Sequence, residues 1–248
     1  MTSSDIFSKM HNRRRKTRRV TLSFKEIFMI KAVVFDLDGT LMNTLDDLYA
    51  GVNRALEKCG YPAVDKEKVR LSVGNGVAKL VARCMPEGTE ADFDRVLRTF
   101  NREYALCKDD HTAPYPGAVR AMKNLKAAGI KIAVVSNKTE SAVKALCAEK
   151  FAGVYDIAVG DDGVRPLKPA PEPISFALGK LGVDKSEAVY VGDQEVDVLT
   201  ARNSGLRLLG AGWGFRGAEK LKAAGAEEVC SDFSEIEEKI LKNRSFLD

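Results

Sequence analysis

The chain has 248 residues, of which 45% are hydrophobic and 30% are charged, the composition of an ordinary globular protein. This length suits one α/β domain with an insertion or two small domains, and no apolar run approaches the roughly 20 residues that span a bilayer. The five cysteines are scattered, with no CxxC pair and no neighbouring histidine cluster. We therefore expect reduced thiols and neither a disulfide framework nor a zinc site.

The positive charge of the chain is concentrated at its N terminus. The formal net charge is +4, yet residues 1–28 hold eight Lys and Arg against two acids, which leaves 31 basic and 33 acidic residues beyond them. A basic segment of this kind can attract nucleic acid or an anionic membrane, or can act as a targeting signal. Because nothing else in the sequence is typical of a nucleic-acid-binding protein, we predict a disordered arm, or sequence upstream of the native start, before a domain that begins at Met29.

After the arm, short apolar runs alternate with helical stretches. The expected strands are Ile30–Phe35, Lys131–Ser136, Ile157–Val159, Ala188–Gly192 and Arg207–Leu209. The expected helices between them are Pro116–Ala128, Thr139–Glu149, Pro171–Leu181 and Val196–Asn203. Continuous Val, Ile and Leu runs that alternate with helices are typical of a parallel sheet covered on both faces. The sequence therefore predicts a doubly wound, Rossmann-like α/β core.

Residues 45–113 interrupt this alternation, because their apolar pattern is helical throughout. We predict that they form an all-helical cap domain, inserted into a core made of residues 29–44 and 114–248. In open α/β sheets the ligand site lies beyond the carboxyl ends of the strands. An insertion that leaves the first strand at that edge is expected to cover the site as a lid.

Polar side chains follow three of the expected strands and occupy one proline-rich loop. They are Asp36, Asp38, Ser136, Asn137, Lys168, Asp193 and Asp197. Each has an ordinary explanation, since Asp-Gly pairs form turns and Ser or Asn cap helices. Together they would meet at one sheet edge, where clustered carboxylates repel one another unless a cation lies among them. Oxygen ligands without His or Cys favour Mg²⁺, and a lysine with a hydroxyl suits a phosphoryl group.

Four motifs, DLDGTL, VVSNK, LKPAPEP and VGDQEVD, occur in an order and spacing that resemble those of the haloacid dehalogenase-like hydrolase superfamily. The helical insertion resembles the cap of its C1 subgroup. Within that group the chain is most similar to phosphoglycolate phosphatases, through SVGNGVAKLV, HTAPYPGAVRAMKNLKAAG and GAGWGFRGAEKLKAAGAEEVCSDFSEI. The resemblance implies a Mg²⁺-dependent phosphatase that forms an aspartyl-phosphate intermediate on a small monoester, with 2-phosphoglycolate the expected substrate.

The resemblance also implies a role for each candidate residue. Asp36 would be the nucleophile, and Asp38 would act as general acid and then as general base. Phosphate would be bound by Ser136, Asn137 and Lys168. The carboxylates of Asp36 and Asp193 and the backbone carbonyl of Asp38 would bind Mg²⁺. Asp197 would orient a water molecule or Lys168.

Several features narrow the resemblance. The second acid, Asp38, disfavours a dehalogenase, and Leu48 stands where β-phosphoglucomutase-like members have a histidine. Asn43 stands where many members of the superfamily have an acid. The alternatives are a phosphatase of sugar phosphates, nucleotides or pyrophosphate, a phosphomutase or phosphotransferase, and a binding protein with a degenerate site. The last is disfavoured because every catalytic position is intact.

Substrate specificity is expected from the cap. The residues Gly74, Asn75 and Gly76 could form a loop that reaches the leaving group, although an ordinary inter-helix turn has the same composition. We expect a small phosphorylated metabolite as the partner, with no nucleic acid and no membrane. A cytoplasmic location and a monomer or homodimer complete the expectations.

Overall fold

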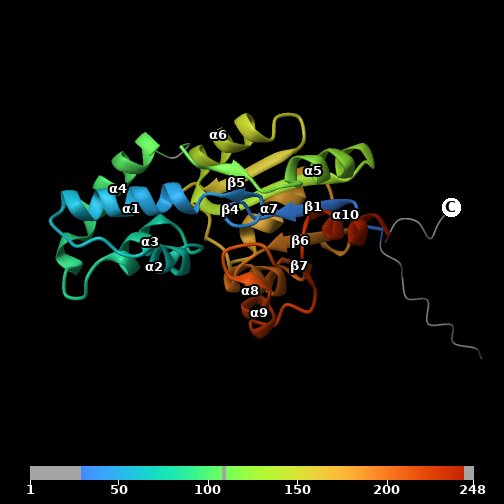
Figure 1. Cartoon of the computed structure of the whole chain (residues 1–248). Helices are drawn as coiled ribbons and strands as arrows, with labels where there is room; N and C mark the ends of the chain where they lie inside the picture. The colour runs from blue at the N-terminus through green and yellow to red at the C-terminus, as the bar shows by residue number, and fades with distance from the viewer. Residues whose placement is uncertain (1–28, 108–109, 243–248) are drawn as a thin grey trace, which may run out of the picture.

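A computed structural model describes residues 29–107 and 110–242, so the basic arm predicted over residues 1–28 lies outside the described residues. A parallel sheet has helices on both faces, and a further group of helices lies at one end of it (Figure 1). The strands of the main sheet, in spatial order, are β5 (Ile157–Asp161), β4 (Lys131–Thr139), β1 (Ala32–Phe35), β6 (Ala188–Gly192), β7 (Arg207–Ala211) and β8 (Val229–Cys230). All neighbouring strands pair in parallel, which confirms the predicted doubly wound α/β core.

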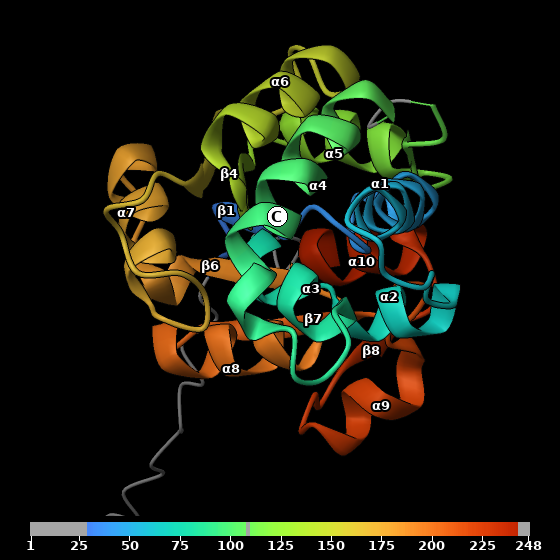
Figure 2. The same cartoon turned by 90° about the vertical axis from the view of Figure 1, so that its left-hand side faces the viewer.

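The main sheet forms because its central strands are apolar on both faces. Every residue of β1 and of β6 is buried. One face of the sheet packs against α5 (Ala118–Ala127), α6 (Glu140–Lys150) and α10 (Phe233–Lys242), and the other against α7 (Glu172–Leu181) and α8 (Glu195–Ser204) (Figure 2). The short α9 (Gly217–Ala223) packs beside α8. Helices on both faces leave the carboxyl edge of the sheet as the accessible part of the core.

Three elements near the C terminus were not predicted from the sequence: β8, α9 and α10. The strand β8 has two residues and α9 has seven, which are too short to show a clear period. Helix α10 buries Phe233, Ile236 and Ile240 at helical spacing, a pattern that the sequence does contain. The predicted helix Thr139–Glu149 begins at Glu140 instead, because β4 continues to Thr139.

The inserted helices have a hydrophobic cluster of their own. They are α1 (Leu45–Lys58), α2 (Lys66–Ser72), α3 (Val77–Cys84), the 3₁₀ turn η1 (Glu90–Asp92) and α4 (Phe93–Cys107). Helix α1 packs along α4, with Leu48, Val52 and Leu56 in the same cluster as Val96 and Phe100. We propose that this helical group is the cap predicted from the sequence, and we call it the cap. No helix of the described residues is long and apolar enough to span a membrane.

The two connections between the sheet and the cap lie side by side. They form a small antiparallel sheet of β2 (Met42–Asn43) and β3 (Ala113–Pro114), which was not predicted from the sequence. The buried carboxylate of Asp47, in the first turn of α1, accepts hydrogen bonds from the backbone N–H groups of His111 (3.0 Å) and Thr112 (2.8 Å). These hydrogen bonds fix the returning connection to the start of the cap.

Candidate active site

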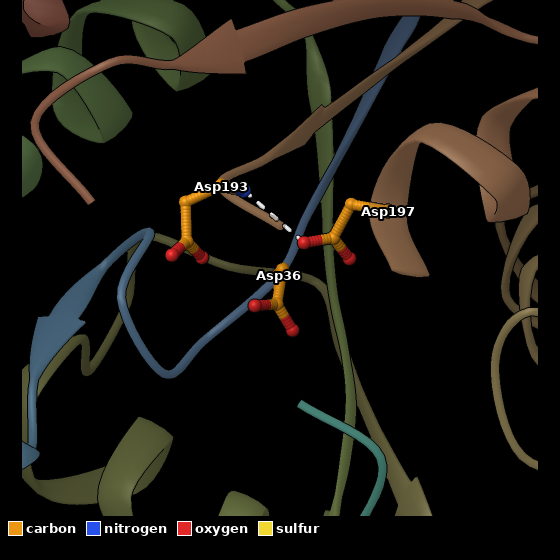
Figure 3. A group of neighbouring side chains, drawn as sticks. All are labelled: Asp36, Asp193 and Asp197. Carbon is orange, nitrogen blue, oxygen red and sulfur yellow. Dashed lines mark hydrogen bonds between the residues drawn. The ribbon is translucent and has the colours of Figure 1, made fainter. Parts of the chain in front are cut away.

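Three of the predicted acids meet at the carboxyl edge of the sheet. Asp36 directly follows β1, Asp193 directly follows β6, and Asp197 lies in the first turn of α8. One carboxylate oxygen from each lies within 4.8 Å of the others, and all three side chains are buried. Figure 3 shows the three carboxylates converging from these elements. Parallel strands produce this convergence because their carboxyl ends share one edge of the sheet.

Lys168 joins two of these acids. It precedes α7 in the proline-rich loop, and its Nζ donates to Oδ1 of Asp36 at 2.6 Å and to Oδ1 of Asp197 at 2.9 Å. The hydroxyl of Tyr190, on β6, lies 2.8 Å from both the Lys168 Nζ and Oδ1 of Asp197. Burial acts to lower the pKa of Lys168, but attraction to Asp197 and Asp36 raises it well above its ordinary value. The lysine is therefore a fixed positive charge beside Asp36.

Two of the acids have raised pKa values although a lysine lies beside them. Burial raises the pKa of Asp36 to about 7; Lys168 opposes this shift and Asp197 adds to it. Burial, with repulsion from Asp197 and Asp36, also raises the pKa of Asp193 well above its ordinary value. Buried carboxylates with raised pKa values are stabilised in the ionised form by a further cation. The cluster therefore has the electrostatics of a cation site built from oxygen ligands.

Asp197 is fully hydrogen-bonded within the protein. Its Oδ1 meets Lys168 and Tyr190, and its Oδ2 accepts the backbone N–H groups of Asp193 (3.1 Å) and Gln194 (3.0 Å). A Cβ added at Gly192 would lie 2.4 Å from the Asp197 Cβ, so only glycine fits there. These contacts place Asp197 where it holds both Lys168 and the turn that presents Asp193.

The carboxylate of Asp193 is oriented by two further groups. Its Oδ1 accepts from the hydroxyl of Thr40 at 2.9 Å, and its Oδ2 accepts from the backbone N–H of Phe215 at 2.8 Å. Gly39, with φ of +92°, lets the loop after β1 pass so close that an added Cβ would lie 2.4 Å from the Asp193 Oδ2. The first motif and the loop after β7 therefore both position Asp193.

Ser136 and Asn137, near the end of β4, both line the cavity described below. The amide of Asn137 is also bonded to backbone groups: Oδ1 accepts from the Lys168 N–H (2.8 Å), and Nδ2 donates to the carbonyls of Lys168 (2.9 Å) and Gly74 (3.0 Å). The phosphate-binding role expected of Asn137 stays a prediction, and its hydrogen bonds also connect the Lys168 loop to the cap.

A small cavity of about 40 Å³ lies between this edge of the sheet and the cap. Its polar side includes Asp36, Asp38, Ser136, Lys138 and Lys168, and its apolar side includes Leu48, Val73, Val77, Leu80 and Val196. Gly74 and Gly76 line this cavity and Asn75 does not, while the specificity role expected of these three residues stays a prediction. Asn75 lines a neighbouring hollow and accepts a hydrogen bond from Arg83 at 2.9 Å. A Cβ added at Gly74 would lie 2.1 Å from Oε1 of Gln194, so the cap loop touches the core directly.

Comparison with known proteins agrees with this geometry. The family model described as haloacid dehalogenase-like hydrolase matches residues 33–211. The chain belongs to the haloacid dehalogenase-like hydrolase family. It is 32% identical to the phosphoglycolate phosphatase of Vibrio parahaemolyticus, over 84% of this chain and 94% of that one.

Two crystal structures extend this similarity within the haloacid dehalogenase-like hydrolases. One is a protein of Lactobacillus delbrueckii subsp. bulgaricus whose assignment as a phosphoglycolate phosphatase is itself a prediction. It is 36% identical, with a TM-score of 0.81, and the match covers 86% of this chain and 98% of that one. The other is a mutant of CbbY from Rhodobacter sphaeroides in complex with xylulose-(1,5)bisphosphate, 27% identical with a TM-score of 0.70, over 84% and 96% of the two chains.

Sequence reasoning missed several residues of this haloacid dehalogenase-like site, among them Thr40, Tyr190 and Lys138. Lys138 is buried, and its Nζ lies 3.3 Å from Oδ1 of Asp38 and 3.0 Å from the hydroxyl of Tyr104 on cap helix α4. Burial acts to lower the pKa of Lys138, but attraction to Asp38 and Tyr104 raises it above its ordinary value. The signal was present, since Lys138 is the third consecutive polar residue at the end of a buried strand.

Proposed function

We propose that the protein is a Mg²⁺-dependent phosphatase that hydrolyses a small phosphate monoester, 2-phosphoglycolate above others. The observation that carries the proposal is the contact of Lys168 with Asp36, beside Asp193 and within a cavity that Asp38 also lines. A nucleophilic carboxylate, a fixed cation and a second carboxylate are the groups that phosphoryl transfer through an aspartyl phosphate requires. The phosphoglycolate phosphatase relatives support the choice of substrate.

The residues at the site fit Mg²⁺. The donors are oxygen atoms, which a hard cation prefers, and burial together with repulsion between carboxylates raises the pKa values of Asp36 and Asp193. We infer that the carboxylates of Asp36 and Asp193 and the backbone carbonyl of Asp38 hold the ion. Asp197 is excluded from this set because both of its oxygens already accept two hydrogen bonds. When bound, Mg²⁺ neutralises the carboxylates and polarises the phosphoryl oxygens.

The chemistry assigned to the side chains has two steps. In the first, a carboxylate oxygen of Asp36 attacks phosphorus, the bond from phosphorus to the ester oxygen breaks, and Asp38 gives a proton to the leaving oxygen. In the second, Asp38 removes a proton from a water molecule, which attacks the aspartyl phosphate and releases inorganic phosphate. Lys168 balances the charge on Asp36, and the hydroxyl of Ser136 donates to the phosphoryl group.

The size of the cavity supports a small substrate. The cavity of about 40 Å³ lies between the cap and the core, which favours a small leaving group. The structure of CbbY in complex with a sugar bisphosphate keeps a sugar phosphate as the second candidate. A cytoplasmic location, a monomeric or homodimeric state and the absence of nucleic-acid partners stay predictions.

Phosphate release from a panel of esters tests the proposal. The panel contains 2-phosphoglycolate, sugar phosphates, nucleotides and pyrophosphate, each with Mg²⁺ and with EDTA. We expect release from 2-phosphoglycolate to be fastest, to need Mg²⁺ and to vanish in Asp36→Asn. Release that survives in Asp36→Asn would contradict the aspartyl-phosphate mechanism. Faster release from a sugar phosphate would favour the second candidate.

A further inference from the structure

Two side chains, Tyr104 and Lys138, connect the cap to the second carboxylate of the first motif, Asp38. Lys138, at the end of β4, lies between Asp38 in the core and Tyr104 in the cap, with its Nζ 3.3 Å from the Asp38 Oδ1 and 3.0 Å from the Tyr104 hydroxyl. The Lys138 side chain is 6% exposed and that of Asp38 is 13% exposed, so water competes little for these contacts. A buried ammonium group bonded in this way has a restricted orientation.

The Tyr104 hydroxyl is held in place by the packing of the cap itself. The Tyr104 ring stacks on Phe100 with centroids 5.4 Å apart and planes 9° apart. Gly51 of α1 lets α4 approach closely, since a Cβ there would lie 3.2 Å from the Tyr104 Cβ. The position of the hydroxyl therefore follows the position of the whole α1–α4 pair. If the cap moves away from the core, the hydroxyl leaves Lys138.

We propose that Lys138 and Tyr104 are positioning residues, which hold the Asp38 carboxyl at the leaving oxygen only while the cap is closed. This inference rests on the proposed function, in which Asp38 is the general acid. The cap then has two roles. It encloses the substrate, and it orients the general acid through the contacts of Lys138 with Tyr104 and with Asp38. Proton delivery to the leaving group is thus tied to the closed arrangement.

A second role for Lys138 has to be separated from this one. Lys138 lines the cavity, so its ammonium group could instead bind the carboxylate of the substrate. The two roles predict different responses to the leaving group. An acid-positioning residue matters for any alkyl phosphate and little for an acyl phosphate, because acetate leaves as a stable anion without a proton. A carboxylate-binding residue matters only for substrates that have a carboxylate.

Three two-carbon substrates make the distinction: 2-phosphoglycolate, ethyl phosphate and acetyl phosphate. The quantity to measure is kcat/KM, which covers the steps up to formation of the aspartyl phosphate. For Tyr104→Phe we expect about a 10-fold loss with 2-phosphoglycolate and ethyl phosphate, and less than about a 3-fold loss with acetyl phosphate. For Lys138→Met we expect the same pattern with about a 100-fold loss. Tyr61→Phe removes another cap hydroxyl, bonded to Asp92, and is the matched control.

The outcomes are distinct. Equal losses with all three substrates would overturn the inference, because they would indicate a merely structural role. A loss confined to 2-phosphoglycolate would overturn it in favour of carboxylate binding. If Lys138→Met does not fold, Tyr104→Phe still decides, because it removes a single oxygen atom. No turnover of any substrate by the wild-type protein would instead refute the proposed function.

Discussion

The guanidinium group of Arg216, in the core loop after β7, donates a hydrogen bond of 2.6 Å to the backbone carbonyl of Arg70 in the last turn of cap helix α2. It also donates to the carbonyls of Leu71 (2.9 Å) and Val73 (3.2 Å) and pairs with Glu195. A cation at a helix C terminus satisfies carbonyls that have no partner within the helix and favours the helix dipole. A side chain of the core therefore satisfies the C-terminal carbonyls of a helix in the cap.

The residue before Arg216 connects the same loop to the acid cluster. Phe215 donates its backbone N–H to Asp193, and its side chain is buried in the hydrophobic cluster of the cap. One loop thus contacts a proposed metal ligand on one side and the cap on the other. We therefore expect a movement of the cap to change the orientation of the Asp193 carboxylate.

The first prediction concerns Arg216→Lys, which keeps the charge but cannot reach three carbonyls. We expect kcat/KM for the substrate to fall about 10-fold, equivalent to about 1.4 kcal/mol, because the closed arrangement is less populated. Steady-state kinetics measure this, and Arg207→Lys, which alters an exposed pair with Glu228, is the matched control. Unchanged kinetics in Arg216→Lys would show that the cap closes without this contact.

The second prediction concerns pH and metal. The metal-free pKa of Asp36 is about 7 in the folded protein, against an ordinary value of 3.8. Between these two values the folded protein binds a proton that the unfolded chain has lost, so the contribution of Asp36 to stability falls as pH rises through this window. In EDTA, Asp36→Asn should therefore raise Tm more at pH 8 than at pH 5.

The stabilisation of the folded protein by Mg²⁺ should increase with pH, because Mg²⁺ competes with a proton for Asp36. At a concentration of about 100 Kd it stabilises by about 2.7 kcal/mol, roughly 5–10 °C in Tm for a protein of this size. We expect this shift at pH 8 and little of it at pH 5, where Asp36 is protonated. Thermal unfolding at both pH values measures it, and an equal shift at pH 5 and pH 8 would contradict the assignment of Asp36 as a ligand.

The third prediction concerns the hydroxyl of Tyr190, which meets Lys168 and Asp197. Tyr190→Phe leaves Lys168 with its two carboxylate partners but removes the hydroxyl that helps to orient its ammonium group. We expect kcat to fall about 10-fold with KM nearly unchanged, and the free energy of unfolding to fall by about 1 kcal/mol. Tyr155→Phe, on a tyrosine beside the core away from the cavity, is the control. A change in KM alone would indicate that Tyr190 acts on binding.

The sequence was sufficient to predict which residues the sheet brings together. Asp36 and Asp193 follow neighbouring parallel strands, and any such sheet places both at one edge. The sequence was insufficient for contacts between distant segments. The bonds from Arg216 to Arg70 and from Lys138 to Tyr104 depend on how the cap docks on the core, which no local pattern specifies. The bond from Asn137 to Gly74 was not predicted for the same reason, because Gly74 lies in the cap.

The fourth prediction concerns Gly74, where the cap loop meets the core. Its φ is +120°, and an added Cβ would lie 2.1 Å from Oε1 of Gln194. Two effects follow from Gly74→Ala: backbone strain of about 1–3 kcal/mol, and displacement of Gln194 from the edge of the cavity. We expect KM to rise about 10-fold, with a modest loss of stability. The double variant Gly74→Ala with Gln194→Ala should regain only part of the loss, because the strain stays.

Gly88 supplies the control for strain alone. It also lies in the cap with φ of +80°, yet an added Cβ there would meet nothing within 4 Å. Gly88→Ala should therefore lower Tm by a similar amount and leave KM unchanged. If both variants change KM equally, strain in the cap and not contact with Gln194 controls substrate binding. If neither does, the loop around Gly74 has no part in specificity, and the specificity role predicted for residues 74–76 is wrong.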